Sequence, residues 1–188
     1  MRPDRPVRAR PDIEAVLSRV ATAAPIPPEP VIAADSADLV AALVEAGQTV
    51  ATAESLTAGL LGATIAGIPG ASAVLRGGLI VYATDLKNSL AGVSADTLAT
   101  DGPVAASTAE QLAVGARRRC EADWGIGLTG VAGPDPQDGK PVGTVFLGIA
   151  GPQSTEVLRL KLSGDRWTIR VGAVRAAVAE LVRSVRGE

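Results

Sequence analysis

Segments with the length and composition of β-strands alternate with segments of helical periodicity along this chain from residue 49 onward. The strand-like segments are 49–53, 78–83, 124–128, 143–150 and 156–162. Helical segments are expected at 60–67, at 101–119 and from 166 onward. This alternation favours a layered α/β domain. No helix separates the last two strands, so we expect them to form a hairpin, which makes the sheet mixed.

Polar residues stand where two of the predicted helices begin. Asp35 or Ser36 is expected to cap a helix that precedes the first strand and ends at Gly47. The predicted inward face of this helix consists of Leu39, Val40, Leu43 and Val44. Asp165 is expected to cap the last helix, with Val174, Val178, Leu181, Val182 and Val185 facing inward.

Residues 1–31 differ in character from the rest of the chain. Residues 12–23 carry apolar side chains at helical spacing, and four prolines follow at positions 25, 27, 28 and 30. Such a proline-rich stretch is typical of a stiff linker. We therefore predict an N-terminal appendage over 1–31, made of a short helix and a linker, and a single domain over 32–188.

The composition excludes several kinds of chemistry. The chain has no histidine, which excludes a Ser-His-Asp triad and nearly every zinc site. Its three lysines stand against fifteen arginines, and only a lysine can lose its proton when buried and act as a base. One cysteine permits no internal disulfide, and a net charge of −2 favours neither nucleic acid nor a membrane surface. A cytoplasmic protein is expected.

Residues 54–59 lie where the first predicted strand turns into a helix. At the carboxyl end of a strand, loops and helix N-termini collect ligands in α/β sheets. A hydroxyl at this place lies near unpaired backbone N–H groups, which can stabilise an oxyanion. Ser55 is therefore a candidate nucleophile. The alternative is that Ser55 and Thr57 only cap the helix.

Tyr82 is the only tyrosine and is expected to end the second strand, with Lys87 five residues later. Without histidine, a serine nucleophile needs another base, and a nearby lysine and tyrosine supply one. Lys87 would accept the serine proton, and Tyr82 would relay or position it. The alternative is a solvated surface lysine beside a half-buried strand tyrosine.

Small residues follow the third predicted strand and allow backbone N–H groups to approach an anion. The candidates for such contacts are Thr129, Gly130, Ala132 and Gly133. Lys140 could reach the same anion as a point charge, and Arg166 could clamp a phosphate. The alternatives are an ordinary Gly-Pro turn and a solvated arginine.

Five stretches in order resemble one family, the C-terminal domain of competence/damage-inducible protein A (CinA). They are residues 53–59, 77–82 with Lys87, 129–134, 140–145 and 164–166. The resemblance implies a three-layer α/β/α sandwich, a serine amidohydrolase without metal or cofactor, and commonly a homodimer. It assigns catalysis to Ser55, Tyr82 and Lys87.

The activity that this resemblance implies is hydrolysis of the carboxamide of nicotinamide mononucleotide to nicotinate mononucleotide and ammonia. Backbone N–H groups at the helix start after Ser55 would hold the oxyanion. The small-molecule nucleotide would contact Glu54, Thr57, Gly59, Thr129, Gly130, Ala132, Gly133, Lys140 and Arg166. No nucleic-acid partner is expected.

Two stretches depart from the family pattern. Ala58 replaces the first glycine of a usual pair, and Ala105 and Ala106 stand where a serine is frequent. Two other functions stay open beside this activity. One is a catalytically silent nucleotide- or partner-binding module in competence or DNA-damage physiology, and the other is an amidase of another carboxamide.

Overall fold

The computed structural model describes residues 33–187. The predicted appendage over 1–31 lies outside the described residues.

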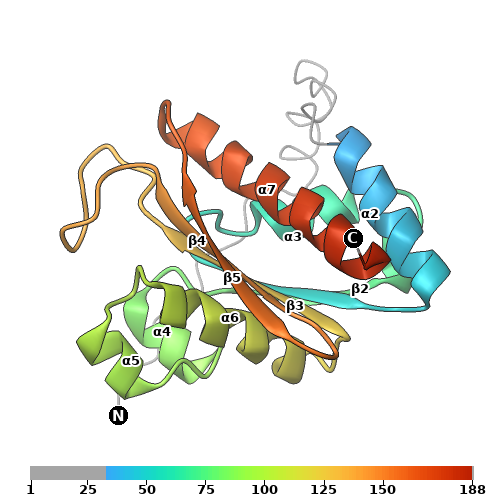
Figure 1. Cartoon of the computed structure of the whole chain (residues 1–188), viewed down its shortest axis with the longest axis horizontal. Helices are drawn as coiled ribbons and strands as arrows, with labels where there is room; N and C mark the ends of the chain where they lie inside the picture. The colour runs from blue at the N-terminus through green and yellow to red at the C-terminus, as the bar shows by residue number, and fades with distance from the viewer. Residues whose placement is uncertain (1–32, 188) are drawn as a thin grey trace, which may run out of the picture. The chain divides into compact units, whose positions relative to one another are not determined.

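Five strands form a single mixed sheet in the order β2-β1-β3-β4-β5 (Figure 1). The strands are β1 (Val50–Glu54), β2 (Leu75–Ile80), β3 (Trp124–Gly130), β4 (Thr144–Ala150) and β5 (Thr155–Lys161). β1 runs parallel to both β2 and β3, whereas β4 pairs antiparallel with β3 and β5. The predicted hairpin and mixed sheet are therefore confirmed. Every residue of β1 and β4 is buried, as expected for strands covered on both faces.

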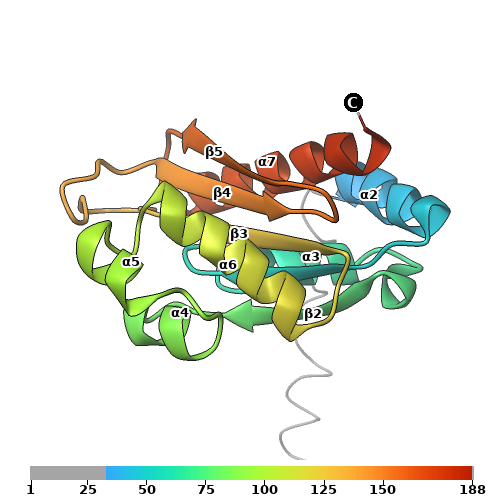
Figure 2. The same ribbon diagram turned by 60° about the horizontal axis from the view of Figure 1, so that its bottom comes forward.

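Helices cover both faces of the sheet, which confirms the predicted three-layer α/β/α sandwich (Figures 1 and 2). One layer contains α2 (Ala33–Ala46), α3 (Leu60–Ala66) and α7 (Arg166–Arg186). The other contains α6 (Ala106–Arg119), beside which lie the short helices α4 (Thr84–Ser89) and α5 (Ala95–Thr100). The largest apolar cluster joins the sheet to α2, α3 and α7.

Glycines on the sheet allow α6 to lie close to β3 and β4. A Cβ atom at Gly127 or at Gly148 would stand 2.3 Å from the carbonyl oxygen of Ala109 in α6. No side chain fits at that distance, so these two positions require glycine. The close approach fixes α6 across β4 and β3, and the carboxyl end of β3 borders the candidate site.

The structure corrects several predicted boundaries. β2 covers Leu75–Ile80 rather than 78–83, so Tyr82 lies two residues beyond the strand. Pairing with β1 sets this boundary, because Ile80 is the partner of Glu54 at the end of β1. β3 continues through Gly130, which places Thr129 inside the strand rather than after it.

The helices also differ in part from their predictions. α6 begins at Ala106 rather than at 101, and residues 95–100 form α5, whose N-cap is Ser94. α2 begins before Asp35 and Ser36, so neither residue is the cap. Val44 is 52 % exposed and does not face inward, unlike the other three residues of its predicted face. The cap of α7 is confirmed, since the Asp165 carboxylate accepts a hydrogen bond from the Thr168 N–H at 2.7 Å.

Candidate active site

The carboxyl ends of β1 and β3 and the segment after β2 border a cavity of about 160 Å³. Eight of the predicted site residues line it: Ser55, Tyr82, Lys87, Thr129, Gly130, Ala132, Gly133 and Arg166. Four others do not line it: Glu54, Thr57, Gly59 and Lys140. The three predicted catalytic side chains therefore share one cavity, because the parallel strands β1 and β2 end at the same edge of the sheet.

Ser55 follows β1 directly and does not act as a helix cap. Its N–H donates to the carbonyl oxygen of Leu128 at 2.9 Å, which continues the pairing of β1 with β3. The next helix, α3, begins five residues later, and its N-cap is Gly59 at φ 92°, without a capping side chain. The alternative of Ser55 as a cap is therefore wrong.

Glu54 holds the loop between β1 and α3 rather than facing the cavity. Its side chain is 1 % exposed, and its carboxylate accepts hydrogen bonds from the N–H groups of Gly59, Leu61 and Gly62 at 2.8–3.1 Å. The Thr52 hydroxyl donates a fourth bond at 3.1 Å. A carboxylate at the first turn of a helix takes the N–H groups that have no partner within the helix. Glu54 is thus placed as an anchor of this loop.

These bonds conflict with the predicted position of the oxyanion site. We expected it at the start of the helix, but the Glu54 carboxylate occupies three of the N–H groups there. The N–H groups of Leu56 and Thr57 donate to no acceptor among the residues that the structure describes. These two free donors directly follow Ser55 in the sequence, and Leu56 itself lines the cavity.

Lys87 is almost completely buried, with 2 % of its surface exposed. Its Nζ donates to the carbonyl oxygens of Val81 at 2.9 Å and Tyr82 at 3.2 Å. Burial lowers the pKa of this amine from its ordinary value, and the nearby Asp85 carboxylate opposes that shift in part. The alternative of a solvated surface lysine is wrong.

Tyr82 and Arg166 are joined at the rim of the cavity. The Tyr82 side chain is 53 % exposed, and its hydroxyl oxygen accepts a hydrogen bond from an Arg166 Nη atom at 2.6 Å. The other Nη atom of Arg166 donates to the carbonyl oxygen of Gly133 at 2.7 Å. Arg166 therefore connects the start of α7 to two walls of the cavity, instead of being a purely solvated side chain.

The wall formed by residues 129–137 contains both predicted residues and two that the sequence had not indicated. Thr129 is fully buried, and its hydroxyl donates to the carbonyl oxygen of Pro103 at 2.6 Å. Asp135 and Gln137, on the loop between β3 and β4, line the same cavity. Lys140 lies beyond them, where its backbone pairs with that of Gln137 in a turn.

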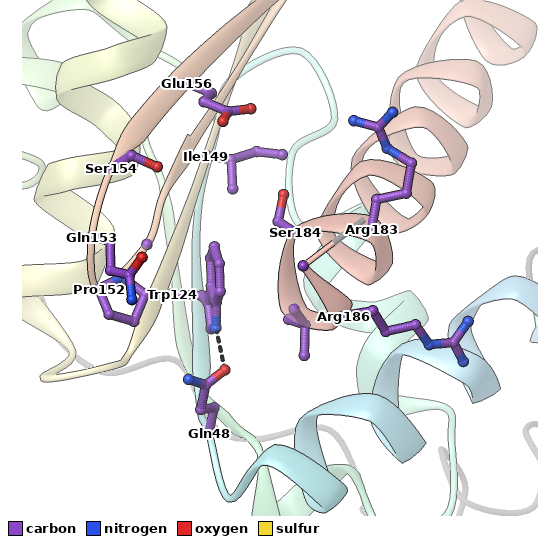
Figure 3. Close-up of a pocket in the computed structure, with 13 residues that line it drawn as sticks. Gln48, Trp124, Ile149, Pro152, Gln153, Ser154, Glu156, Arg183, Ser184 and Arg186 are labelled. Atoms are coloured by element: carbon purple, nitrogen blue, oxygen red, sulfur yellow. Dashed lines mark hydrogen bonds between the residues drawn. The ribbon is translucent and has the colours of Figure 1, made fainter.

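A larger cavity of about 470 Å³ lies at the other end of the sheet (Figure 3). Trp124, at the start of β3, lines it together with the turn after β4 and the end of α7. The indole N–H of Trp124 donates to the Gln48 side chain at 2.8 Å. This cavity contains none of the predicted site residues.

The described part of the chain offers neither a metal site nor a membrane span. Between residues 33 and 187, no three His, Cys, Asp or Glu side chains are grouped so that they could hold a metal ion. No helix in the same range is long and apolar enough to cross a membrane.

Known proteins are similar to this chain in sequence and in fold. The family model for the CinA C-terminal domain matches residues 33–185. A CinA-like protein of Frankia casuarinae is 48 % identical over 141 residues, which is 75 % of this chain and 32 % of that protein. The chain thus spans about a third of the length of the curated relatives it matches.

Solved structures agree with the sequence relatives. A competence-damaged protein (CinA) superfamily protein from Enterobacter cloacae is 32 % identical, with a TM-score of 0.79 over 82 % of this chain and 92 % of that one. The competence/damage inducible protein CihA from Agrobacterium tumefaciens is 33 % identical, with a TM-score of 0.79 over 82 % and 95 %.

Proposed function

We propose a function for this chain from the fact that it belongs to the CinA C-terminal domain family. The chain is a serine amidohydrolase, and its substrate is the carboxamide of nicotinamide mononucleotide. Its products are nicotinate mononucleotide and ammonia.

The burial of Lys87 beside the cavity that contains Ser55 is the observation that carries this proposal. A neutral amine has two hydrogens and one lone pair. Both hydrogens are engaged by the carbonyl oxygens of Val81 and Tyr82. The lone pair is then available to accept a proton, and the lowered pKa favours this neutral form. These are the properties of a general base in a chain without histidine.

The reaction proceeds in two halves. In the first, the Ser55 oxygen bonds to the carboxamide carbon while its proton passes to Lys87. The N–H groups of Leu56 and Thr57 stabilise the oxyanion of the tetrahedral intermediate. The C–N bond then breaks, and the amide nitrogen takes a proton from Lys87, directly or through Tyr82, and leaves as ammonia. In the second, water attacks the acyl carbon and loses a proton to Lys87. The C–O bond to Ser55 then breaks, Lys87 returns the proton to the Ser55 oxygen, and nicotinate mononucleotide leaves.

Recognition of the phosphate falls to Arg166 in this proposal. Lys87 and Arg166 are the cationic residues among those that line the cavity, and Lys87 is engaged in the chemistry. Arg166 carries two donors at the rim, where a guanidinium and the adjacent backbone of residues 130–133 suit an anion. Lys140 lies outside the lining and is not assigned to this role. A cytoplasmic homodimer stays a prediction.

A substrate series tests the proposal. Ammonia release is measured with nicotinamide mononucleotide, nicotinamide riboside and nicotinamide. We expect turnover of the mononucleotide, with a much higher KM or no turnover once the phosphate is absent. Equal turnover of all three would instead support an amidase of another carboxamide.

A catalytically silent binding module is the second candidate, and the conformation of Ala58 favours it. This alanine adopts φ 51°, in the left-handed region that favours glycine, within the loop that carries Ser55. Binding of the mononucleotide without release of ammonia would support this candidate.

A further inference from the structure

Arg170, near the start of α7, is a second side chain besides Glu54 that holds the loop carrying Ser55. Its Nε donates to the carbonyl oxygen of Leu56 at 3.0 Å, and its Nη2 donates to that of Thr57 at 2.8 Å. The Trp167 ring lies over the guanidinium, 5.6 Å from ring centroid to Cζ. The planar guanidinium of Arg170 therefore fixes two successive peptide groups in the loop that carries Ser55, called the nucleophile loop below.

The orientation of these peptides determines where the free N–H groups point. In a trans peptide the C=O of one residue and the N–H of the next point in opposite directions. Arg170 binds the carbonyl of Leu56, so the N–H of Thr57 points away from α7. The carbonyl of Ser55 accepts a bond from the Ala58 N–H at 3.1 Å, which fixes the N–H of Leu56 in the same way.

We propose that Arg170 is a positioning residue that orients the backbone N–H donors for the oxyanion formed at Ser55. This inference rests on the proposed serine mechanism. Arg170 is not among the residues that line the cavity and makes no bond to Lys87, so it acts on the oxyanion side of the reaction. The planar shape of the guanidinium matters more than its charge, because a lysine cannot hold two carbonyl oxygens in a fixed plane.

A fluorophosphonate probe tests this role without depending on the natural substrate. The Ser55 oxygen bonds to phosphorus, fluoride leaves, and the serine proton passes to Lys87, so the probe uses the same oxyanion donors. The wild-type chain, Arg170→Met and Arg170→Lys are compared, with Arg175→Met as the matched control. Arg175 is an exposed arginine of the same helix. The rate of labelling, its final stoichiometry and its pH profile are measured, with mass spectrometry to locate the adduct.

We expect Arg170→Met to slow labelling about 100-fold, the size of effect that a misplacement near 1 Å produces. Arg170→Lys should recover part of that rate, and Arg175→Met should match the wild type. The final stoichiometry and the apparent pKa of the pH profile should not change in either Arg170 variant. With a turned-over substrate, kcat should fall while KM stays within about 2-fold.

Three outcomes would overturn the inference. One is an Arg170→Met rate within about 2-fold of the wild type. Another is an unchanged rate with a lower final stoichiometry, which would show that Arg170 only supports folding. Both would leave the proposed function intact. A wild type that is not labelled at Ser55 would sink the inference and the proposed serine mechanism together.

Discussion

Replacing Glu54 by glutamine tests how the nucleophile loop is held. One carboxylate oxygen accepts from the Thr52 hydroxyl at 3.1 Å and the Gly62 N–H at 2.8 Å. The other accepts from the N–H groups of Gly59 and Leu61 at 3.0 and 3.1 Å. An amide has one oxygen, so it can replace only one of these pairs. In its best orientation the amide oxygen accepts from the N–H groups of Gly59 and Leu61, which are fixed in the backbone and can only donate. The NH₂ group then faces Thr52, whose hydroxyl can rotate.

The magnitude follows from what this orientation loses. The Thr52 hydroxyl can rotate and accept, but the N–H of Gly62 is left facing an NH₂ group. A buried N–H without an acceptor costs about 1–3 kcal/mol. The bonds that remain become neutral, which weakens each by about 1 kcal/mol, while a neutral amide is easier to bury than a carboxylate. We expect a net decrease of about 3 kcal/mol in the free energy of unfolding.

Urea unfolding measures this change. With an m-value of about 2 kcal/mol per molar, the midpoint should fall by about 1.5 M at unchanged slope. Glu45→Gln is the matched control, because Glu45 is exposed on α2, and it should shift the free energy of unfolding by no more than about 0.5 kcal/mol. A Glu54→Gln protein within about 1 kcal/mol of the wild type would refute the anchor role.

Substitutions at three further positions have defined outcomes. Lys87→Arg should abolish amide hydrolysis as fully as Lys87→Ala, since arginine cannot accept a proton. The wild-type rate should rise with pH as Lys87 loses its proton, and the pKa of this rise should lie below 10.5. Between that lowered pKa and 10.5 the unfolded chain binds more protons than the folded chain, so the wild-type free energy of unfolding should also rise with pH. Urea titrations at several pH values should show this rise in the wild type and not in Lys87→Met. Ala58→Gly should raise the thermal midpoint by a few degrees, because it relieves a left-handed alanine that costs about 1–2 kcal/mol. Arg166→Ala removes the bonds to Tyr82 and Gly133 and should raise KM about 10-fold in steady-state assays, with a smaller effect on kcat.

The layered fold could be predicted because its signals are local. Strand length, helical spacing and the capping residue Asp165 depend on neighbours in the sequence, and the structure confirms them. The boundaries of β2 could not be predicted in this way, because pairing of Ile80 with Glu54 on another strand sets them. α5 was missed for a related reason. It has six residues with little apolar periodicity, and its Ser94 cap gave the only local signal.

The candidate site was predictable where sequence order and sheet topology coincide. Ser55 and Lys87 share a cavity because each follows one of two parallel neighbouring strands. The burial of Lys87 was not predictable from spacing, since it depends on how α4 packs after β2. Glu54 was predicted to contact substrate, but the loop after it folds back so that the start of α3 reaches its carboxylate. Arg170 lies 114 residues from Leu56, a pairing that no local pattern indicates.

Hydrolysis of nicotinamide mononucleotide by the wild type and by Ser55→Ala tests the central claim most directly. Ammonia and nicotinate mononucleotide are measured together, from neutral to alkaline pH, with circular dichroism to establish that both proteins are folded. We predict equal amounts of the two products from the wild type and a loss of several orders of magnitude in rate for Ser55→Ala. The fold should be kept, because the Ser55 hydroxyl makes no helix-capping bond. A Ser55→Ala protein that retains a substantial rate, or a folded wild type that releases no ammonia at any of these pH values, would contradict the account.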